Sequence, residues 1–274
     1  IKKINAQVYF QRAASAETGL IALICKVLNR RFIYMVAHVQ DVSGSFVRQN
    51  GWRGKLFLFG LNLADIIICQ TQEQKMALNQ ALRKKSVVIA SGYPVKPLRK
   101  ITKQGILWVA RAETWKQPEL FIQLAKKFPQ EKFTMICPPA ENKPHYFKQN
   151  KTLAATVPNL TFIKQVPFSR IDAYFASAKV FVSTSLSEGF PNTFIQAAKN
   201  MTPIISFKVN PDKIIDKFKI GFCADGNEKQ MIILMKKMLT NEPLRKKLGV
   251  NAYRYTRKNH DIKKVAANII DNIL

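Results

Sequence analysis

Residues 183–200, STSLSEGFPNTFIQAAKN, combine a single carboxylate with a turn and the predicted start of a helix. Proline is favoured at the first helical position, which suits Pro191, and Asn192 and Thr193 would lie in the first turn. Backbone amides at a helix start can bind phosphate, and the carboxylate of Glu188 can hold hydroxyl groups through charge-assisted hydrogen bonds. A capped helix beside a solvated glutamate accounts for the same residues, so this stretch alone leaves both interpretations open.

A second loop, within WVARAETWKQPEL at residues 108–120, carries two cations. Arg111 ends a predicted strand, and Lys116 comes shortly before a helix that is predicted to begin near Pro118. The planar fork of arginine and the mobile charge of lysine can converge on a diphosphate from one loop. A basic loop in a basic protein is the competing explanation.

Short apolar runs alternate with amphipathic stretches along most of the chain. Several runs are apolar throughout, as in strands covered on both faces, so the alternation predicts parallel sheets with helices on both sides. In such folds ligands bind beyond the carboxyl ends of the strands, where both loops are expected to lie. The predicted strands are residues 8–10, 32–37, 65–69, 86–90, 105–110, 132–137, 160–166, 179–185 and 202–207, and the predicted helices are residues 16–29, 54–63, 71–82, 117–127, 143–154, 169–177, 191–199, 211–217, 227–239, 242–258 and 261–273.

The segment SGYPVKPLRKITKQ, residues 91–104, places prolines, a glycine and several basic residues between two predicted strands. Such a composition is typical of a linker. We therefore expect a partial N-terminal domain at residues 1–95. A complete doubly wound α/β domain with a helical C-terminus is expected at residues 96–274.

The chain has 274 residues and a formal net charge of +27. Residues 1–100 hold 16 basic and 4 acidic side chains and residues 101–274 hold 28 and 13, so the charge is spread along the chain. The basic residues are not concentrated in one arm or tail, as they often are in nucleic-acid-binding proteins. Their even distribution is consistent with binding to an anionic membrane surface or to a phosphorylated substrate. A lysine-rich composition without a specific partner remains the alternative. Residues 52–60, WRGKLFLFG, are either an interfacial helix or a buried one.

No run reaches the roughly 20 apolar residues of a membrane-spanning helix. Asn62 and Asp65 interrupt the longest one, residues 56–69. The N-terminus lacks the apolar region of a signal peptide and does not start with methionine, which suggests a fragment. The four cysteines are far apart and are expected to be buried, free thiols in a reducing compartment. The expected location is the cytoplasm, with peripheral association at the inner face of the membrane.

ARAETWKQPEL and SLSEGFPNTFIQAAKNMTPIISF together resemble the C-terminal half of the retaining GT-B glycosyltransferases, the group 1 family related to glycogen and sucrose synthases. SVVIASGYPV, residues 86–95, is similar to the strand end that enters the interdomain hinge of that family, and the resemblance covers most of residues 86–260. It implies a GT-B α/β fold of two Rossmann-like doubly wound parallel-sheet domains, the first one incomplete. It also implies transfer of a sugar from a nucleotide-diphosphate sugar to an acceptor.

The resemblance implies a role for each matching residue. Arg111 and Lys116 would neutralise the donor diphosphate as it becomes the leaving group. Glu188 would be a catalytic residue that holds hydroxyls of the transferred sugar. Gln196 stands where the family has a second glutamate that grips the ribose, and an amide can bind a diol without supplying charge. The remaining sugar and phosphate contacts would lie around Gly189, Phe190, Pro191, Asn192 and Thr193.

His38 follows a predicted apolar strand in FIYMVAHVQDVSGSF, where the family often has a histidine that faces the cleft. The resemblance makes it a second catalytic residue, and a structural histidine is the alternative. His145 and His260 are expected at the surface. Arg12 is either an acceptor contact or part of a solvated helix start. The chain departs from the family pattern at Ala110, which replaces a glycine.

These expectations describe a hexosyltransferase-type enzyme that needs no metal, because no Asp-x-Asp sequence occurs in the chain and the protein's own cations would bind the phosphates. No cofactor is expected beyond the nucleotide sugar, which is the donor substrate. The acceptor would be a glycan or a lipid-linked intermediate of surface polysaccharide synthesis. The alternative is a non-catalytic nucleotide-binding remnant or scaffold, which Gln196 and the incomplete first domain support. A nucleic-acid-binding protein has the least support.

Overall fold

The computed structural model describes residues 3–96 and 101–273 of the 274-residue chain. Its contacts divide the chain into two compact units. The first unit comprises the residues up to Gly92, Glu188–Phe190 and the residues from Ile262 onward, and the second comprises Tyr93–Ser187 and Pro191–Asp261. The division falls within the predicted linker at 91–104, of which residues 97–100 lie outside the described part.

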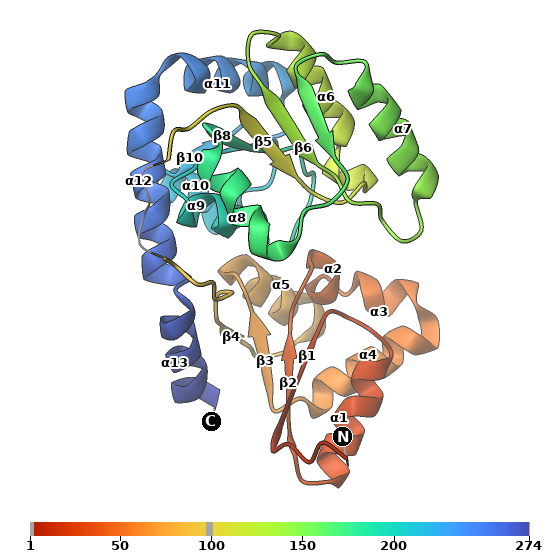
Figure 1. Cartoon of the computed structure of the whole chain (residues 1–274). Coiled ribbons are helices and arrows are strands. Elements are labelled where there is room, and N and C mark those ends of the chain that lie inside the picture. Colours follow the sequence, from red (N-terminus) through yellow and green to blue (C-terminus); the bar gives the residue numbers. More distant parts are fainter. Residues whose placement is uncertain (1–2, 97–100, 274) are drawn as a thin grey trace. The chain divides into compact units, whose positions relative to one another are not determined.

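The first unit is built on a parallel sheet with the strand order β1-β2-β3-β4 (Figure 1). Three consecutive residues of β2 are buried, as expected for an apolar strand that helices cover on both faces. The elements are β1 Val8–Arg12, α1 Glu17–Val27, β2 Arg31–Met35, α2 Val39–Val42, α3 Ser45–Gln49, α4 Gly51–Leu63, β3 Ile66–Cys69, α5 Gln72–Leu82 and β4 Val87–Val88.

Helices cover both faces of the first sheet (Figure 1). On one face, Phe57 of α4 lies edge to face against Tyr34 of β2, with 5.4 Å between the ring centres. On the opposite face, Val265 of the C-terminal helix α13, Ile262–Ile273, packs with Ile33 and Ile68. This apolar contact explains why α13 groups with the first unit, whereas we expected it within a second domain at residues 96–274.

The second unit is built on a parallel sheet with the order β10-β9-β8-β5-β6-β7. The chain runs outward from β5 through β6 and β7, then continues on the other side through β8, β9 and β10. β5 and β8 are therefore neighbours, and Ile106 pairs with Val180. The elements are β5 Ile106–Val109, η1 Thr114–Lys116, α6 Pro118–Lys127, β6 Phe133–Ile136, α7 Pro144–Ala155, β7 Leu160–Ile163, α8 Phe168–Ser177, β8 Val180–Ser183, α9 Asn192–Lys199, β9 Ile204–Ser206, η2 Pro211–Lys213, α10 Ile214–Lys217, β10 Gly221–Cys223, α11 Glu228–Thr240 and α12 Glu242–Asn259.

The helix boundaries of the second unit follow from local side-chain chemistry. Pro118 occupies the first position of α6, where its missing N–H is no loss. Asn227 caps α11 by accepting a hydrogen bond of 3.0 Å from the amide of Gln230. Asn241 caps α12 in the same way, at 2.9 Å from the amide of Leu244.

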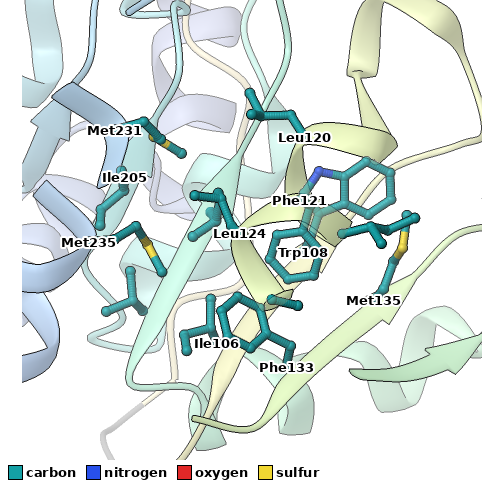
Figure 2. Packing of buried hydrophobic residues seen from close by; sticks show 14 of the residues in the cluster. Ile106, Trp108, Leu120, Phe121, Leu124, Phe133, Met135, Ile205, Met231 and Met235 are labelled. Atoms are coloured by element: carbon teal, nitrogen blue, oxygen red, sulfur yellow. The ribbon is translucent and has the colours of Figure 1, made fainter. Parts of the chain in front are cut away.

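Aromatic side chains fill the core between the second sheet and its helices (Figure 2). Trp108 of β5 stacks on Phe121 of α6 with 6.1 Å between the ring centres, and Phe133 of β6 meets Phe121 edge to face at 5.3 Å. Met231 and Met235 of α11 pack into the same core. Because this core packing fixes the position of β5, it also fixes the point at which the following loop begins.

The predicted alternation of strands and helices is confirmed, and the structure adds elements that the sequence analysis missed. β10 has only three residues, which is too few for a periodic pattern to be recognised. The short helices α2 and α3 follow β2 where none was predicted. His260 is buried, at 1% exposure, with its Nε2 2.9 Å from the Tyr255 hydroxyl, so its predicted surface position is wrong. His145 is exposed, as expected.

All four cysteines are free, and Cys25, Cys69 and Cys137 are buried. Burial raises the pKa of Cys137 to about 12 and is the main cause that raises the pKa of Cys223 to about 11. Both thiols are therefore protonated and poorly nucleophilic at neutral pH. Within the part of the chain that the structure describes, no helix has the length and apolar character needed to cross a bilayer.

Candidate functional site

The candidate site of the second unit lies at the carboxyl ends of β5 and β8. The order of the strands reverses between these two neighbours, which makes this place the switch point of the doubly wound sheet. Arg111 follows β5 closely, and Thr184 directly follows β8. The fold thus brings together the two loops that the sequence singles out, at the position where open α/β sheets bind their ligands.

Thr184 joins these two loops. Its hydroxyl accepts a hydrogen bond of 2.8 Å from Nε1 of Trp108 and donates one of 2.5 Å to the carbonyl oxygen of Lys116. A further hydrogen bond of 2.8 Å runs from the amide of Leu186 to the carbonyl oxygen of Trp115. Because the Thr184 side chain is buried, its hydroxyl fixes the backbone of Lys116 against the end of β8.

The loop between β5 and α6 is basic. Arg111 is exposed, and Lys116 is half-buried in the short turn η1. Lys143, at the start of α7, forms an ion pair of 2.9 Å with Glu113, and its Nζ lies 5.1 Å from the ring centre of Trp115. Since Glu113 is the acid of this loop and Lys143 balances it, the loop keeps a net positive charge.

The loop after β8 leads into α9. This helix begins at Asn192 with Pro191 as its N-cap residue and has no acid in its first turn. No side chain caps it, so the capped-helix interpretation is wrong for this helix start. Its first turn is instead an uncapped, positively polarised helix end. Asn192 is exposed and Thr193 is half-buried.

Glu188, Gly189 and Phe190 precede that helix in the chain, and their contacts group them with the first unit. Glu188 is half-buried, whereas Gly189 and Phe190 are buried. The sequence did not predict that these three residues would be assigned apart from Pro191 and the rest of the motif. Their proposed contacts with a sugar remain predictions.

Gln196 lies in the second turn of α9, on its buried side. The residue is 7% exposed, between the buried side chains of Ile195 and Ala197. Its carbonyl oxygen accepts a hydrogen bond of 2.8 Å from Nδ2 of Asn200.

His38 follows β2 in the first unit and is half-buried. The nearby carboxylate of Asp41 is buried and accepts hydrogen bonds from the amides of Ala37, at 2.7 Å, and His38, at 3.2 Å. It also accepts one of 3.1 Å from the Tyr34 hydroxyl. Nδ1 of His38 accepts a bond of 3.3 Å from the amide of Gln40, which leaves Nε2 as the protonated ring nitrogen.

Three important residues escaped the sequence analysis. A buried indole N–H requires a hydrogen-bond acceptor, so Trp108 predicted that one would be present, but no feature of the sequence identified Thr184 as that acceptor. Asp41 was the one acid in an otherwise apolar and neutral stretch, which could have marked it as a structural carboxylate.

Among the residues that the structure describes, no group of three or more His, Cys, Asp or Glu side chains is arranged to hold a metal ion.

The structure contains two α/β units, each built on a parallel sheet with helices packed around it. This arrangement places the chain in the GT-B class of Rossmann-like folds. The chain belongs to the family of glycosyl transferases group 1, whose model matches residues 94–255, more than half of its length. The matched range runs from the start of the second unit into α12. The resemblance to the group 1 family inferred from the two motifs is thereby confirmed, whereas retention of configuration and an incomplete first domain stay predictions.

Curated relatives agree with this assignment. A glycosyltransferase 1 domain-containing protein of Xenopus tropicalis is 23% identical over 142 residues, which is 52% of this chain and 41% of that protein. An uncharacterized glycosyltransferase of Methanocaldococcus jannaschii is 21% identical over 229 residues, 81% of this chain and 64% of that protein. The chain thus spans about two fifths to two thirds of the length of these relatives.

Solved structures with the same fold extend over both units. HepE of Anabaena, determined in complex with UDP and glucose, has a TM-score of 0.79 and 15% identity, and the match covers 96% of this chain and 77% of HepE. Sucrose-phosphate synthase of Thermosynechococcus elongatus has a TM-score of 0.78 and 14% identity, with coverage of 98% and 73%. TarM has a TM-score of 0.75 and 18% identity, with coverage of 96% and 54%.

Proposed function

We propose that this protein is a glycosyltransferase that moves a hexose from a nucleotide-diphosphate sugar to an acceptor, with retention of configuration. One observation carries the proposal: Thr184 holds the loop of Arg111 and Lys116 against the end of β8, at the switch point of the second sheet. That arrangement holds the loop of the two cations at the end of β8, the strand that precedes α9 in the chain. Cations and an uncapped helix start are the groups that stabilise a departing diphosphate.

Each residue then has a defined task. Arg111 and Lys116 bind the two phosphates and balance the negative charge that grows on the leaving group. Glu188 accepts hydrogen bonds from hydroxyls of the transferred sugar, and Gln196 binds the ribose. The turn at Gly189, Phe190 and Pro191 and the first helical residues, Asn192 and Thr193, complete the donor site. His38 offers its protonated Nε2 as a hydrogen-bond donor to the sugar or the acceptor.

The protein's own cations take the place that a metal ion would otherwise occupy, so the reaction needs no added metal. The acceptor is a glycan or a lipid-linked intermediate of surface polysaccharide synthesis, presented at an anionic membrane surface. The even distribution of a net charge of +27 supports such a location. Complexes of similar structures with UDP make UDP and UDP-glucose the first ligands to test.

Isothermal titration with UDP, GDP and ADP tests the donor site. Arg111→Ala and Lys116→Ala each remove a charge-assisted contact, so each is expected to weaken nucleotide binding by about 10-fold or more. Lys127→Ala is the matched control, because Lys127 is exposed in the last turn of α6, at the end remote from the loop. Unchanged binding in the two site variants would refute the assignment.

Release of UDP from UDP-glucose in the presence of glycan acceptors tests turnover, and the same assay with EDTA tests the independence from metal. Nucleotide binding without turnover of any donor in a panel of nucleotide sugars would favour the alternative, a non-catalytic binding protein. Loss of turnover in EDTA would contradict the role assigned to the two cations.

A further inference from the structure

The outer face of α1 is apolar although it is exposed. Leu20, Leu23, Ile24 and Val27 follow one another at helical spacing and are 53%, 43%, 44% and 76% exposed. The opposite side of the same helix is buried against the sheet. A surface helix normally places polar residues on its outer face, so a stripe of four exposed aliphatic side chains indicates an interaction surface.

α4 lies beside α1 (Figure 1). The two helices approach closely, since a Cβ atom on Gly60 would lie 2.6 Å from the backbone of Thr18. On α4, Trp52 is 68% and Phe59 is 41% exposed, whereas Phe57 and Leu61 are buried. The segment WRGKLFLFG is therefore neither a fully buried helix nor a free one: one side packs on the sheet and the other offers aromatic rings to the outside.

Cations accompany these apolar groups. Lys26 is exposed in the last turn of α1, and Arg53 and Lys55 are exposed on α4. The guanidinium of Arg53 lies 5.5 Å from the ring centre of Trp52. α4 contains no acidic residue, and the only acid of α1 is Glu17 in its first turn. The pair of helices thus combines aliphatic, aromatic and positively charged side chains.

We propose that α1 and α4 form a docking surface for an anionic lipid bilayer. The aliphatic stripe and Trp52 enter the boundary between head groups and acyl chains, and Lys26, Arg53 and Lys55 meet the lipid phosphates. Charge complementarity selects this partner, because a second copy of a chain with a net charge of +27 would be repelled. The inference gives the membrane location in the proposed function a definite surface, but it requires no catalysis.

Co-sedimentation with vesicles tests the surface. The full chain is expected to bind vesicles made of equal parts phosphatidylcholine and phosphatidylglycerol, and to bind pure phosphatidylcholine far less. The double variant Leu23→Glu, Ile24→Glu is expected to lose about 10-fold or more of this binding, because both residues would have to carry charge into the apolar boundary. Ile233→Glu is the matched control, since Ile233 is 59% exposed on α11 of the second unit.

Fluorescence gives an independent measurement. Trp52 is 68% exposed on α4, Trp108 is buried, and Trp115 is 38% exposed in the second unit. A blue shift of the emission that arises from Trp52 on adding anionic vesicles is therefore expected to disappear in Trp52→Phe, whereas a shift from Trp115 would remain. Equal vesicle binding by the parent protein and the double variant would overturn the proposal. So would self-association of the parent that the double variant abolishes, because a second copy would then cover the surface. The variants should still bind UDP, so a failure here is distinct from a failure of the proposed function.

Discussion

The hydroxyl of Thr184 donates a hydrogen bond of 2.5 Å to the carbonyl oxygen of Lys116, across 68 positions of sequence. The same hydroxyl accepts from the indole of Trp108, so one side chain links the core of the second unit to the loop that carries its cations. Lys116 is therefore held by its backbone against the end of β8. A fixed backbone suits a residue that must present a charge at a defined place.

Thr184→Val keeps the shape of the side chain and removes the hydroxyl. The indole N–H of Trp108 and the carbonyl of Lys116 then lose a buried partner, which should lower the free energy of unfolding by about 1–3 kcal/mol. Urea unfolding measures this change, and UDP titration should show weaker binding as the loop loosens. Thr161→Val is the control, because Thr161 is exposed on β7. A variant as stable as the parent would mean that the hydrogen bonds of Thr184 contribute little.

Gln196→Glu restores the acid that the family pattern has at this position. If Gln196 binds the ribose, a carboxylate should tighten UDP binding by about fivefold, since charge-assisted hydrogen bonds to hydroxyl groups are the stronger kind. The dideoxy nucleotide, which lacks both ribose hydroxyls, is the control ligand and should show no gain. An equal gain for both ligands would place the ribose elsewhere.

Asp41→Ala removes the acceptor of three hydrogen bonds, from the amides of Ala37 and His38 and from the hydroxyl of Tyr34. Burial, together with the charge of Asp41, raises the pKa of Tyr34 far above its usual range, so Tyr34 is a neutral donor at any working pH. Leaving these donors unpaired should cost about 2–4 kcal/mol of stability.

Thermal or urea unfolding measures that loss, and the His38 ring signals in NMR spectra should shift as its loop loosens. Glu141→Ala, a change of an exposed acid, is the control. A loss below about 0.5 kcal/mol would mean that water replaces the carboxylate and that Asp41 does not position the loop.

Lys103 predicts a dependence of stability on pH. Burial lowers its pKa to about 8, although its Nζ donates hydrogen bonds to the carbonyl of Asn200 and the hydroxyl of Thr202. An unfolded lysine stays protonated up to a pH of about 10.4. Between pH 8 and 10 the unfolded chain therefore binds more protons, and the contribution of Lys103 to stability rises with pH.

Comparison with Lys103→Met isolates this contribution. From pH 7 to pH 10, the free energy of unfolding of the parent should rise by about 2 kcal/mol relative to that of the variant. Lys132→Met, which removes an exposed lysine, should show no such change. A difference that is constant over this range would show that Lys103 keeps an ordinary pKa in the folded protein.

The sequence was most informative where the pattern is local. Continuous apolar runs such as IIIC in β3 and VFVS in β8 identified parallel strands, and Pro118 marked the start of α6. It was least informative where a contact joins distant segments. Neither the pairing of Thr184 with Lys116 nor that of Lys143 with Glu113 has a local signature, because the strand order that creates both is a property of the whole sheet.

The C-terminal helix gives a similar lesson. The apolar positions of α13 predicted a helix, but its partners on the first sheet, Ile33 and Ile68, lie near the other end of the chain. The assignment of Glu188, Gly189 and Phe190 to the first unit was equally invisible, since their motif reads as one continuous loop and helix. Tertiary packing decides which unit a residue belongs to, whereas the periodicity of the sequence indicates only which residues are buried.

The reversal of strand order between β5 and β8 also bears on how the protein folds. The segment that contains β6, β7 and the helices around them separates β5 from β8 in the chain, although these two strands are neighbours in the sheet. Thr184, whose hydroxyl fixes the backbone of Lys116, lies beyond that segment in the sequence. Forming a contact between residues so far apart in the chain costs conformational entropy. We therefore expect the ability to bind a nucleotide to appear late in refolding, after most of the helical signal has returned.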